Sequence, residues 1–299
     1  MARILVSGTI GWDVPLWLDR PLIAGRRIGA QGLAAPSGSG TLAGRLGGGA
    51  ANIASALVLA GHEVLVASRV GQDAQGQYVL FALHERGLSL DGVRVDAGPT
   101  PSVQILIEPG GQRTILGIGW RGGWQPWSID PELVRRFAPD ALVLRGAVPE
   151  IPAGAGLFDG RLVVAHMPRL GAPPARADVA VGSSDDLGGE AFADPYGAAK
   201  AVFGDALAPD GWGVVTDGAN GARAGSGETV LAQPAAPADV VDATGAGDVF
   251  MAGLADALLA NATMAEALAH AAGWAAVAVG IEGSAAEPGA KGFAMFNRG

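Results

Sequence analysis

Short apolar runs alternate with segments of helical pattern along the first part of the chain. Residues 4–8 are apolar and end in glycine, and residues 63–70 form a second such run, so both predict buried strands. Residues 50–60 predict a helix followed by a glycine stop, and residues 75–86 predict an amphipathic helix. Buried strands that alternate with helices are typical of a parallel sheet covered by helices, so the pattern predicts an α/β fold.

The alternation continues beyond a hairpin in the middle of the chain. Residues 103–108 and 113–119 are rich in β-forming side chains and flank a Pro-Gly-Gly turn, which predicts a β-hairpin. Further helical and strand patterns follow at 131–137, 141–144, 162–165, 179–181 and 213–216, and two alanine-rich helices at 247–280 are separated near Asn261. Residues 20–49 have no period and predict irregular structure or a mobile flap. No linker separates two domains, so we expect a single domain over residues 1–299.

Composition and charge exclude several classes of function. The chain has 299 residues, 49% of them hydrophobic, and this is enough to bury a large core. Its formal net charge of −9 repels a phosphate backbone, so we expect no nucleic-acid partner. The absence of cysteine excludes disulfides, thiolate nucleophiles and cysteine-ligated zinc, and is consistent with a cytoplasmic location. Charged residues interrupt the most apolar stretch, 250–281, and residues 1–6 do not form a signal peptide, so we expect no membrane partner.

The glycine-rich sequence Asp242-Ala243-Thr244-Gly245-Ala246-Gly247-Asp248, called here the 242–248 loop, precedes an apolar helix. Such a turn exposes N–H groups at the positive end of a helix dipole, which favours phosphate binding. Asp248 on the first helical turn could accept a proton from a hydroxyl that attacks phosphorus, and Asp242 could bind a cation or hold the turn. An ordinary aspartate at a helix N-terminus is equally compatible with the local pattern. Neither a Walker loop nor a dinucleotide fingerprint occurs.

A second glycine-rich segment, residues 47–52, precedes the first predicted helix. Its three consecutive glycines allow a ligand to touch the backbone, and Asn52 offers both a donor and acceptors, which suits a pair of sugar hydroxyls. A flexible loop in which Asn52 bonds the local backbone is the alternative.

Taken together, these segments resemble the motifs of the ribokinase-like (PfkB) carbohydrate kinase family. Residues 242–248 are similar to the family's D-T-x-G-A-G-D signature, and residues 47–52 and 71–76 are similar to its G-G-x-x-x-N and G-x-D-x-x-G signature. Residues 215–221 resemble its nucleotide-binding strand and T-x-G-x-x-G loop, and Asp13 stands where the family has a sugar-binding aspartate. The motifs occur in the family's order over nearly the whole chain.

The resemblance implies a doubly wound, mostly parallel sheet with helices on both faces and a small β lid. The lid would come from segments at about 15–45 and 101–124, inserted in the α/β core. The implied reaction transfers the γ-phosphoryl group of ATP to a hydroxymethyl group of a small sugar or sugar acid, with Mg²⁺ and K⁺ as cofactors. A homodimer joined through the lid is the candidate assembly.

The resemblance also assigns roles to individual residues. Asp248 is the expected catalytic base, and Gly245, Ala246 and Gly247 are expected to donate N–H groups to the transferring phosphoryl group as an anion hole. The expected binding residues are Asp13, Gly48 and Asn52 for the sugar; Ser183, Thr216, Gly218 and Gly221 for the nucleotide; Asp186 for Mg²⁺; and Asp242, Thr244 and Gly283 for K⁺.

Four positions depart from the family's pattern. Gly49 stands where many relatives have lysine, so a cationic contact on the substrate side is expected to be lost. Ser183 and Asp186 stand in place of the asparagine and glutamate of an N-x-x-E segment, which predicts altered metal handling. Asp217 lies beside the nucleotide-binding strand, where relatives often have an apolar residue, and the sequence assigns it no role.

Several other readings remain open. A nucleoside kinase shares the fold and chemistry, and a non-catalytic sugar- or nucleotide-binding regulator would explain Ser183 and Asp186. A phosphosugar kinase is disfavoured because the 47–52 segment offers no cation, and a nicotinamide-dependent oxidoreductase is disfavoured because no dinucleotide fingerprint follows the first strand.

Some conspicuous side chains predict structural roles. We expect Trp120, Trp124 and Trp127 to pack a glycine-rich loop. Trp12 is a candidate wall of the substrate pocket, and packing in the core is an equal alternative for it. Arg113 and Arg121 are expected to be solvated lid residues. The histidines show no metal-ligand spacing and are expected at the surface or in the core: His62, His84, His166 and His270.

Overall fold

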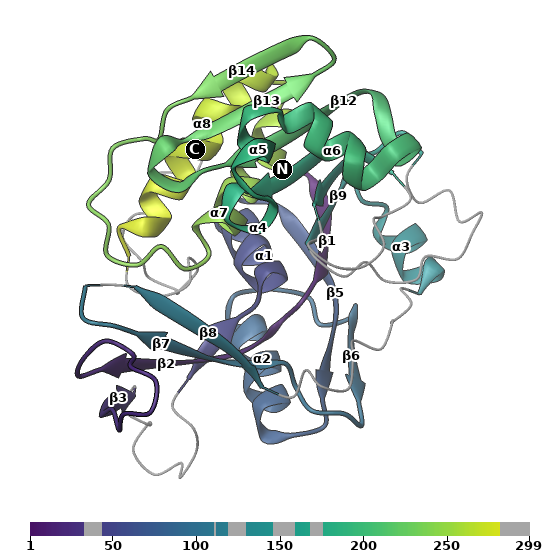
Figure 1. Ribbon diagram of the computed structural model, residues 1–299. Coiled ribbons are helices and arrows are strands. Elements are labelled where there is room, and N and C mark those ends of the chain that lie inside the picture. Colours follow the sequence, from purple (N-terminus) through teal and green to yellow (C-terminus); the bar gives the residue numbers. More distant parts are fainter. Residues whose placement is uncertain (33–43, 111, 119–129, 146–158, 168–175, 282–299) are drawn as a thin grey trace.

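The computed structural model describes residues 1–32, 44–110, 112–118, 130–145, 159–167 and 176–281 (Figure 1). In these residues a nine-stranded sheet has the order β14-β13-β12-β11-β10-β9-β1-β5-β6. The parallel strands are β1 (Arg3–Gly8), β5 (Glu63–Gly71), β6 (Val93–Asp96), β9 (Ala141–Arg145), β10 (Leu162–His166), β11 (Ala177–Ser183) and β12 (Leu207–Thr216). The antiparallel strands β13 (Ala222–Ser226) and β14 (Thr229–Gln233) extend one edge. The predicted mostly parallel α/β sheet is confirmed.

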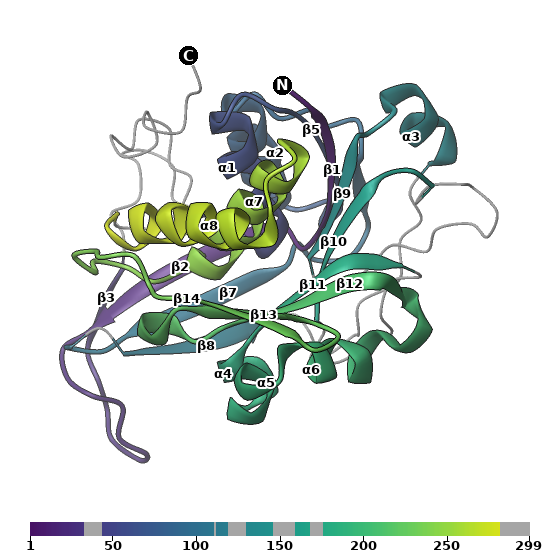
Figure 2. The same ribbon diagram turned by 90° about the horizontal axis from the view of Figure 1, so that it is seen from above.

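Helices cover both faces of this sheet (Figure 2). One face packs on α1 (Gly49–Leu59), α2 (Ala74–Glu85), α7 (Ala246–Leu259) and α8 (Met264–Val279), and the other on α3 (Pro131–Phe137), α5 (Gly189–Ala193) and α6 (Pro195–Phe203). The reason is the alternation of side chains along each strand. In β1, Ile4 and Val6 join the first hydrophobic cluster while Leu5 joins the second.

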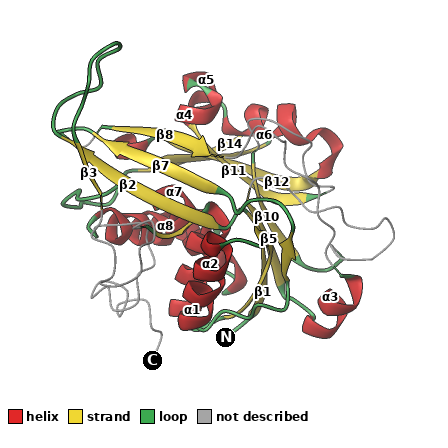
Figure 3. Cartoon of the chain, turned by 90° about the horizontal axis from the view of Figure 1, so that it is seen from below, coloured by secondary structure: helices red, strands yellow, loops and turns green. Residues whose placement is uncertain are grey.

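A separate small sheet lies against the carboxyl end of β1 and forms the lid. Its order is β3 (Ala30–Gly32), β2 (Gly11–Leu18), β7 (Ser102–Ile107) and β8 (Arg113–Ile118), and β4 (Arg45–Gly47) also pairs with β2. Figure 3 shows β3, β2, β7 and β8 side by side. The predicted hairpin is confirmed as β7 and β8. The predicted irregular structure of 20–49 is wrong in part, because backbone pairing with β2 forms β3 and β4 there.

The strand β2 begins directly after β1 ends, so the chain passes from the large sheet into the lid at once. Between the two strands, Ile10 is fully buried and anchors this passage in the core. Asp13 therefore belongs to a lid strand, although the sequence put the start of the lid at about residue 15.

A buried aspartate anchors α7, the helix that follows the 242–248 loop. Asp256 is 6% exposed and its two carboxylate oxygens accept from His62 Nε2 and His270 Nε2, each at 2.8 Å. The Ala2 N–H donates to His62 Nδ1 at 3.2 Å, so the proton of His62 is on Nε2. These bonds tie α7 to α8 and to the turn before β5. None of the helices in the described ranges combines the length and the hydropathy that a membrane-spanning segment requires.

Candidate active site

The 242–248 loop turns sharply into α7. Gly245 has φ 77°, a left-handed conformation that glycine adopts at little cost, and α7 begins at Ala246. The first N–H groups of a helix have no partner within it and point along the positive end of its dipole. The predicted anion hole of Gly245, Ala246 and Gly247 therefore lies where a negative group is favoured.

Asp248 lies on the first turn of α7 and is 8% exposed. Its Oδ2 accepts from Asn52 Nδ2 at 2.8 Å, and its Oδ1 accepts from Arg145 Nε at 2.7 Å. Asn52 comes from α1 and Arg145 from the end of β9. The structure thus brings the predicted base and a predicted sugar-binding residue into contact, and adds an arginine that the sequence analysis did not single out.

Arg145 lies over Gly49, the position at which the resemblance led us to expect a lysine. A Cβ added to Gly49 would lie 2.6 Å from Arg145 Cγ and 2.9 Å from Nε, so a larger residue would displace the arginine. Although Gly49 itself offers no cation, β9 supplies a guanidinium beside Asp248 at this place. Only the pairing of β9 with β1 brings Arg145 near Gly49, so no local motif could have found it.

Asp13 lies on β2 opposite Arg45 of β4, and it is 7% exposed. Burial raises the pKa of Asp13 to about 6, the charge of Arg45 opposes this, and the charge of Asp248 adds to it. The influence of Asp248 shows that the two carboxylates share one region. Gly48, the third residue predicted for the sugar, is the N-cap of α1 beside them.

Asp242 is buried among positive groups. Its Oδ1 accepts from the Thr244 N–H at 2.8 Å and lies 2.6 Å from Arg113 Nη2, and its Oδ2 lies 3.4 Å from Arg45 Nη2. Burial tends to raise the pKa of Asp242, but hydrogen bonds from Thr244 and the charges of Arg113 and Arg45 outweigh it and lower the pKa. The expectation that Arg113 is a solvated lid residue is wrong, because its side chain is only 19% exposed.

The predicted Mg²⁺ residue Asp186 lies next to Ser183. Ser183 ends β11 and caps α4 (Ser184–Leu187), and its Oγ lies 3.2 Å from both the N–H and Oδ2 of Asp186. Asp217, to which the sequence assigned no role, accepts from the Ser184 hydroxyl and from Asn220 Nδ2, and these bonds lower its pKa. Asp217 therefore ties the start of α4 to the 3-10 turn Gly218–Asn220.

A cavity of about 800 Å³ joins the predicted nucleotide residues to the anion hole. Its lining includes all four of them, together with two residues of the α7 N-terminus: Ser183, Thr216, Gly218, Gly221, Ala246 and Gly247. The remaining wall is mostly small and apolar, with Ala272, Ala275 and Val279 from α8 and Val240 from the preceding loop. The volume and the apolar lining of this cavity suit the base of a nucleotide. The helix N-terminus at one end of the cavity suits the phosphates of the same nucleotide.

His166 is a further residue that the sequence analysis did not assign to the site. It ends β10, and burial lowers its pKa to about 4 against the opposing charges of Asp248 and Asp186, while Arg145 lowers it further. His166 is therefore neutral at pH 7 and lies within reach of three charged groups of the site.

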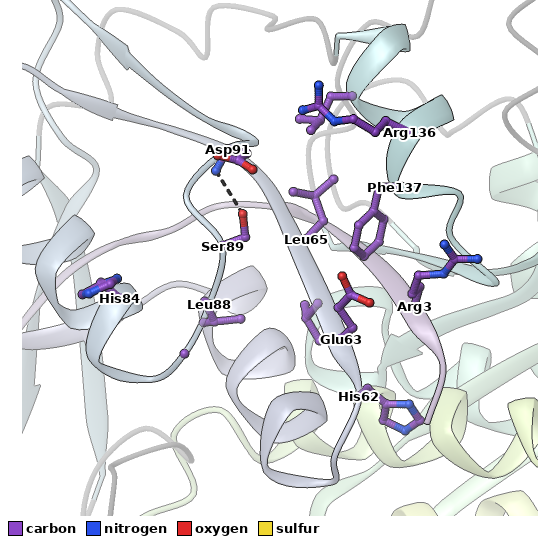
Figure 4. A pocket seen from close by; sticks show the side chains of 13 residues that line it. Arg3, His62, Glu63, Leu65, His84, Leu88, Ser89, Asp91, Arg136 and Phe137 are labelled. Carbon is purple, nitrogen blue, oxygen red and sulfur yellow. Dashed lines mark hydrogen bonds between the residues drawn. The ribbon is translucent and has the colours of Figure 1, made fainter.

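The remaining sequence expectations concern residues elsewhere. Gly283, Trp120, Trp124, Trp127 and Arg121 lie outside the described residues. Trp12 packs in the core and stacks on Tyr78 with ring centroids 5.6 Å apart. A second cavity, of about 590 Å³, lies at the amino ends of β1 and β5, where Arg3, His62 and Glu63 line it (Figure 4). None of the predicted site residues lines that cavity.

Comparison with known proteins places these features in a family. The family model described as pfkB family carbohydrate kinase matches residues 38–146 and 175–289. The chain is similar to an ATP-dependent ribose-1-phosphate kinase of Halopiger xanaduensis, with 31% identity over 99% of this chain and 98% of that protein.

Solved structures share the fold. A ribokinase of Arabidopsis thaliana, complexed with ribose and ATP, superposes with a TM-score of 0.75 at 24% identity, covering 100% of this chain and 99% of that one. A putative ribokinase of Agrobacterium tumefaciens gives a TM-score of 0.77 at 20% identity, covering 98% and 96%. The predicted doubly wound fold with a lid is thereby confirmed.

Proposed function

Since the chain belongs to the pfkB family and is an ATP-dependent carbohydrate kinase, we propose that it transfers the γ-phosphoryl group to a hydroxymethyl group of a small sugar or sugar acid. One observation carries the proposal. Asp248 is held by Asn52 and Arg145 at the start of α7, and the same helix N-terminus lines the cavity suited to a nucleotide.

In the proposed reaction Asp248 is the general base. The acceptor hydroxyl donates its proton to the Asp248 carboxylate as its oxygen bonds to the γ-phosphorus. The bond between that phosphorus and the β–γ bridging oxygen breaks, and ADP leaves. The N–H groups of Gly245, Ala246 and Gly247 stabilise the negative charge on the transferring oxygens. Two bonds to Asp248 fix its direction, which favours catalysis by positioning.

Asp13, Gly48 and Asn52 are proposed to hold the acceptor. Asp13 is a buried carboxylate whose charge reaches Asp248, so sugar hydroxyls that donate to it would lie near the base. Asn52 already donates to Asp248 with its amide nitrogen, which leaves its amide oxygen as an acceptor.

Asp186 is proposed to hold Mg²⁺ through its carboxylate. The side chain is partly buried at the start of α4, near the cavity lined by Ser183, and carboxylate oxygens with water are the ligands that Mg²⁺ takes in kinases. Bound Mg²⁺ would neutralise phosphate charge. The Asp186 carboxylate, with water completing the coordination, fits this ion.

A phosphorylated sugar is the second candidate acceptor. The 47–52 segment has no cation to bind the phosphate of such an acceptor, but the guanidinium of Arg145 lies over Gly49 and provides one. The similarity to a ribose-1-phosphate kinase supports the same candidate. A guanidinium binds phosphate in a bidentate manner, so Arg145 could serve both Asp248 and an acceptor phosphate.

ADP release with Mg-ATP over sugars, sugar acids, sugar phosphates and nucleosides tests the proposal, with Asp248→Asn beside the wild type. We expect turnover on a sugar or sugar phosphate that is lost in the variant. Turnover confined to nucleosides would show that the acceptor is a nucleoside and not a sugar or sugar acid. ATP binding without turnover on any acceptor would contradict catalysis and favour a regulator.

A further inference from the structure

The two described residues expected to bind K⁺, Asp242 and Thr244, are both bound by an arginine of the lid. We propose that the guanidinium of Arg113 is the resident cation of the 242–248 loop, and that the reaction therefore needs no monovalent metal ion. The inference rests on the proposed kinase reaction. It makes Arg113 a positioning residue, because it acts through the loop rather than on the substrate.

The contacts of Arg113 are specific. Its Nη1 donates to Thr244 Oγ1 and its Nη2 lies against Asp242 Oδ1, each at 2.6 Å. One planar guanidinium thus spans two side chains of the same loop, a geometry that arginine offers and lysine does not. The side chains of Arg113 and Asp242 are 19% and 8% exposed, so solvent screens the pair only weakly.

The oxygen atoms of Asp242 and Thr244 that could ligate K⁺ already have positive or hydrogen-bonding partners, so they do not fit an additional cation. Asp242 Oδ1 already accepts from the Thr244 N–H and from Arg113, and Arg45 lies 3.4 Å from Oδ2 with its side chain only 10% exposed. A monovalent ion on this carboxylate would lie beside two buried positive charges and would compete with both. The Thr244 hydroxyl oxygen is likewise occupied by Arg113.

The position of Arg113 in the fold gives this cation a further property. Arg113 is the first residue of β8 and pairs with Ile107 at the end of β7, so it is carried by the lid hairpin. In Figure 1 this end of the hairpin lies beside the loop that joins β14 to α7. The loop supplies the N–H groups of the proposed anion hole. The positive charge at the loop is therefore supplied by the lid hairpin and not by the large sheet.

The test compares wild type with Arg113→Met, which keeps an unbranched apolar stem and removes the charge. The exposed Arg135→Met on α3 is the matched control, since the Arg135 side chain is 65% exposed and pairs with Glu132 on the same helix. Initial rates on the best acceptor are measured in chloride salts of K⁺, Na⁺ and choline at one ionic strength. Melting temperatures of the proteins without substrate are measured in the same salts.

For wild type and the control we expect rates that agree within about twofold in all three salts and equal melting temperatures. For Arg113→Met in choline, kcat falls about 100-fold, the size that loss of positioning can produce. K⁺, but not choline, then raises kcat at least about tenfold and raises the melting temperature, because Asp242 Oδ1 has lost the Arg113 guanidinium and K⁺ can take its place. Arg113→Lys retains a positive charge but lacks the planar guanidinium. In choline it should recover less than half of the kcat that Arg113→Met loses.

Two results would overturn the inference. One is a wild-type rate stimulated tenfold or more by K⁺, or a wild-type melting temperature that K⁺ raises above the choline value. The other is an Arg113→Met protein that matches wild type in kcat and gains no stability from K⁺. If the wild type turns over no acceptor, the proposed kinase reaction fails, and the melting temperatures still decide whether the loop binds K⁺.

Discussion

The proposed acceptor side and the proposed nucleotide side of the site are formed by different kinds of residue. On the acceptor side three buried aspartates, Asp13, Asp242 and Asp248, lie among Arg45, Arg113 and Arg145. Most of the nucleotide cavity is lined by small, apolar residues, with alanines of α8 along one wall. Buried charges act through their exact placement, whereas a small-residue wall acts through its shape. Changes on the acceptor side should therefore lower kcat, and changes in the wall should raise the KM for ATP.

Replacing the proposed base gives the largest expected effect. Asp248→Asn keeps the shape of the side chain but cannot accept the proton, so kcat falls about 10³-fold, within the range for loss of a general base. The dissociation constant for ATP, measured by titration calorimetry, should stay within about threefold, as expected of an interaction made only in the transition state. The exposed Asp210→Asn is the control and should match wild type in both. Equal losses in kcat and in affinity for ATP would contradict the expected separation between the two sides of the site.

Variants of Arg145 and Gly49 test whether the same space can be filled by a side chain from β9 or by one from the start of α1. Arg145→Met should lower kcat about 100-fold, because Asp248 loses a partner and its orientation. Gly49→Lys alone should also be impaired, since its Cβ would lie 2.6 Å from Arg145 Cγ. The double variant should exceed both single variants in kcat, a non-additivity typical of residues in contact. Additive losses, measured as kcat in a double-mutant cycle, would refute the idea that they share one space.

The wall of the nucleotide cavity should respond through KM. Ala275→Leu places a larger side chain in the cavity and should raise the KM for ATP about tenfold, a loss of roughly 1.4 kcal/mol of uniform binding, with kcat within about twofold. Ala265→Leu, on the exposed side of α8, provides the matched control. Steady-state kinetics with ATP varied at saturating acceptor makes the distinction. A kcat loss with unchanged KM would contradict the assignment of the cavity.

The smallest expected effect is a pH dependence from Asp13, whose pKa burial raises to about 6. Below that pH the protonated carboxyl accepts fewer hydrogen bonds from sugar hydroxyls, so kcat/KM for the acceptor should fall severalfold between pH 7 and 5.5. Because the folded pKa exceeds the unfolded one, the stability due to this group is full below about pH 3.8 and is lost as the pH rises through 6.

Asp13→Asn is the matched variant for both parts of this prediction. For this variant, kcat/KM for the acceptor should no longer fall as the pH drops below about 6. Its melting temperature without substrate should change less than that of wild type between pH 4 and 7. A wild-type profile for ATP that shows the same fall as the acceptor profile would place the titrating group on the nucleotide side instead.

Local features of the sequence were sufficient for much of this fold and for the centre of the candidate site. The 242–248 loop, its helix and the 47–52 segment are contiguous, so glycine spacing and the apolar helix that follows reveal them. The helices α5 and α6 and the strands β13 and β14 were missed, because their sequences carry weak periodicity and tertiary pairing stabilises them.

The arginines and His166 show what local patterns cannot provide. Arg145 is 103 positions from Asp248, and Arg113 is 131 positions from Thr244, so only the sheet topology and the lid bring these pairs together. Nothing in the neighbouring sequence distinguishes Arg113 from a solvated lid residue. His166 is similar: its burial and neutral state depend on the strands and charges around β10.

The passage from β1 straight into β2 has a consequence for engineering. Asp13, Arg45 and Arg113 all sit on lid strands, whereas Asp248 and the nucleotide cavity belong to the helix-covered sheet. A chimaera that takes its lid segments from a relative would exchange Asp13, the aspartate proposed to bind the acceptor, together with Arg45 and Arg113, which face the 242–248 loop. Its nucleotide chemistry would stay with the host. Grafts made at the buried Ile10 would need a host core of matching shape there.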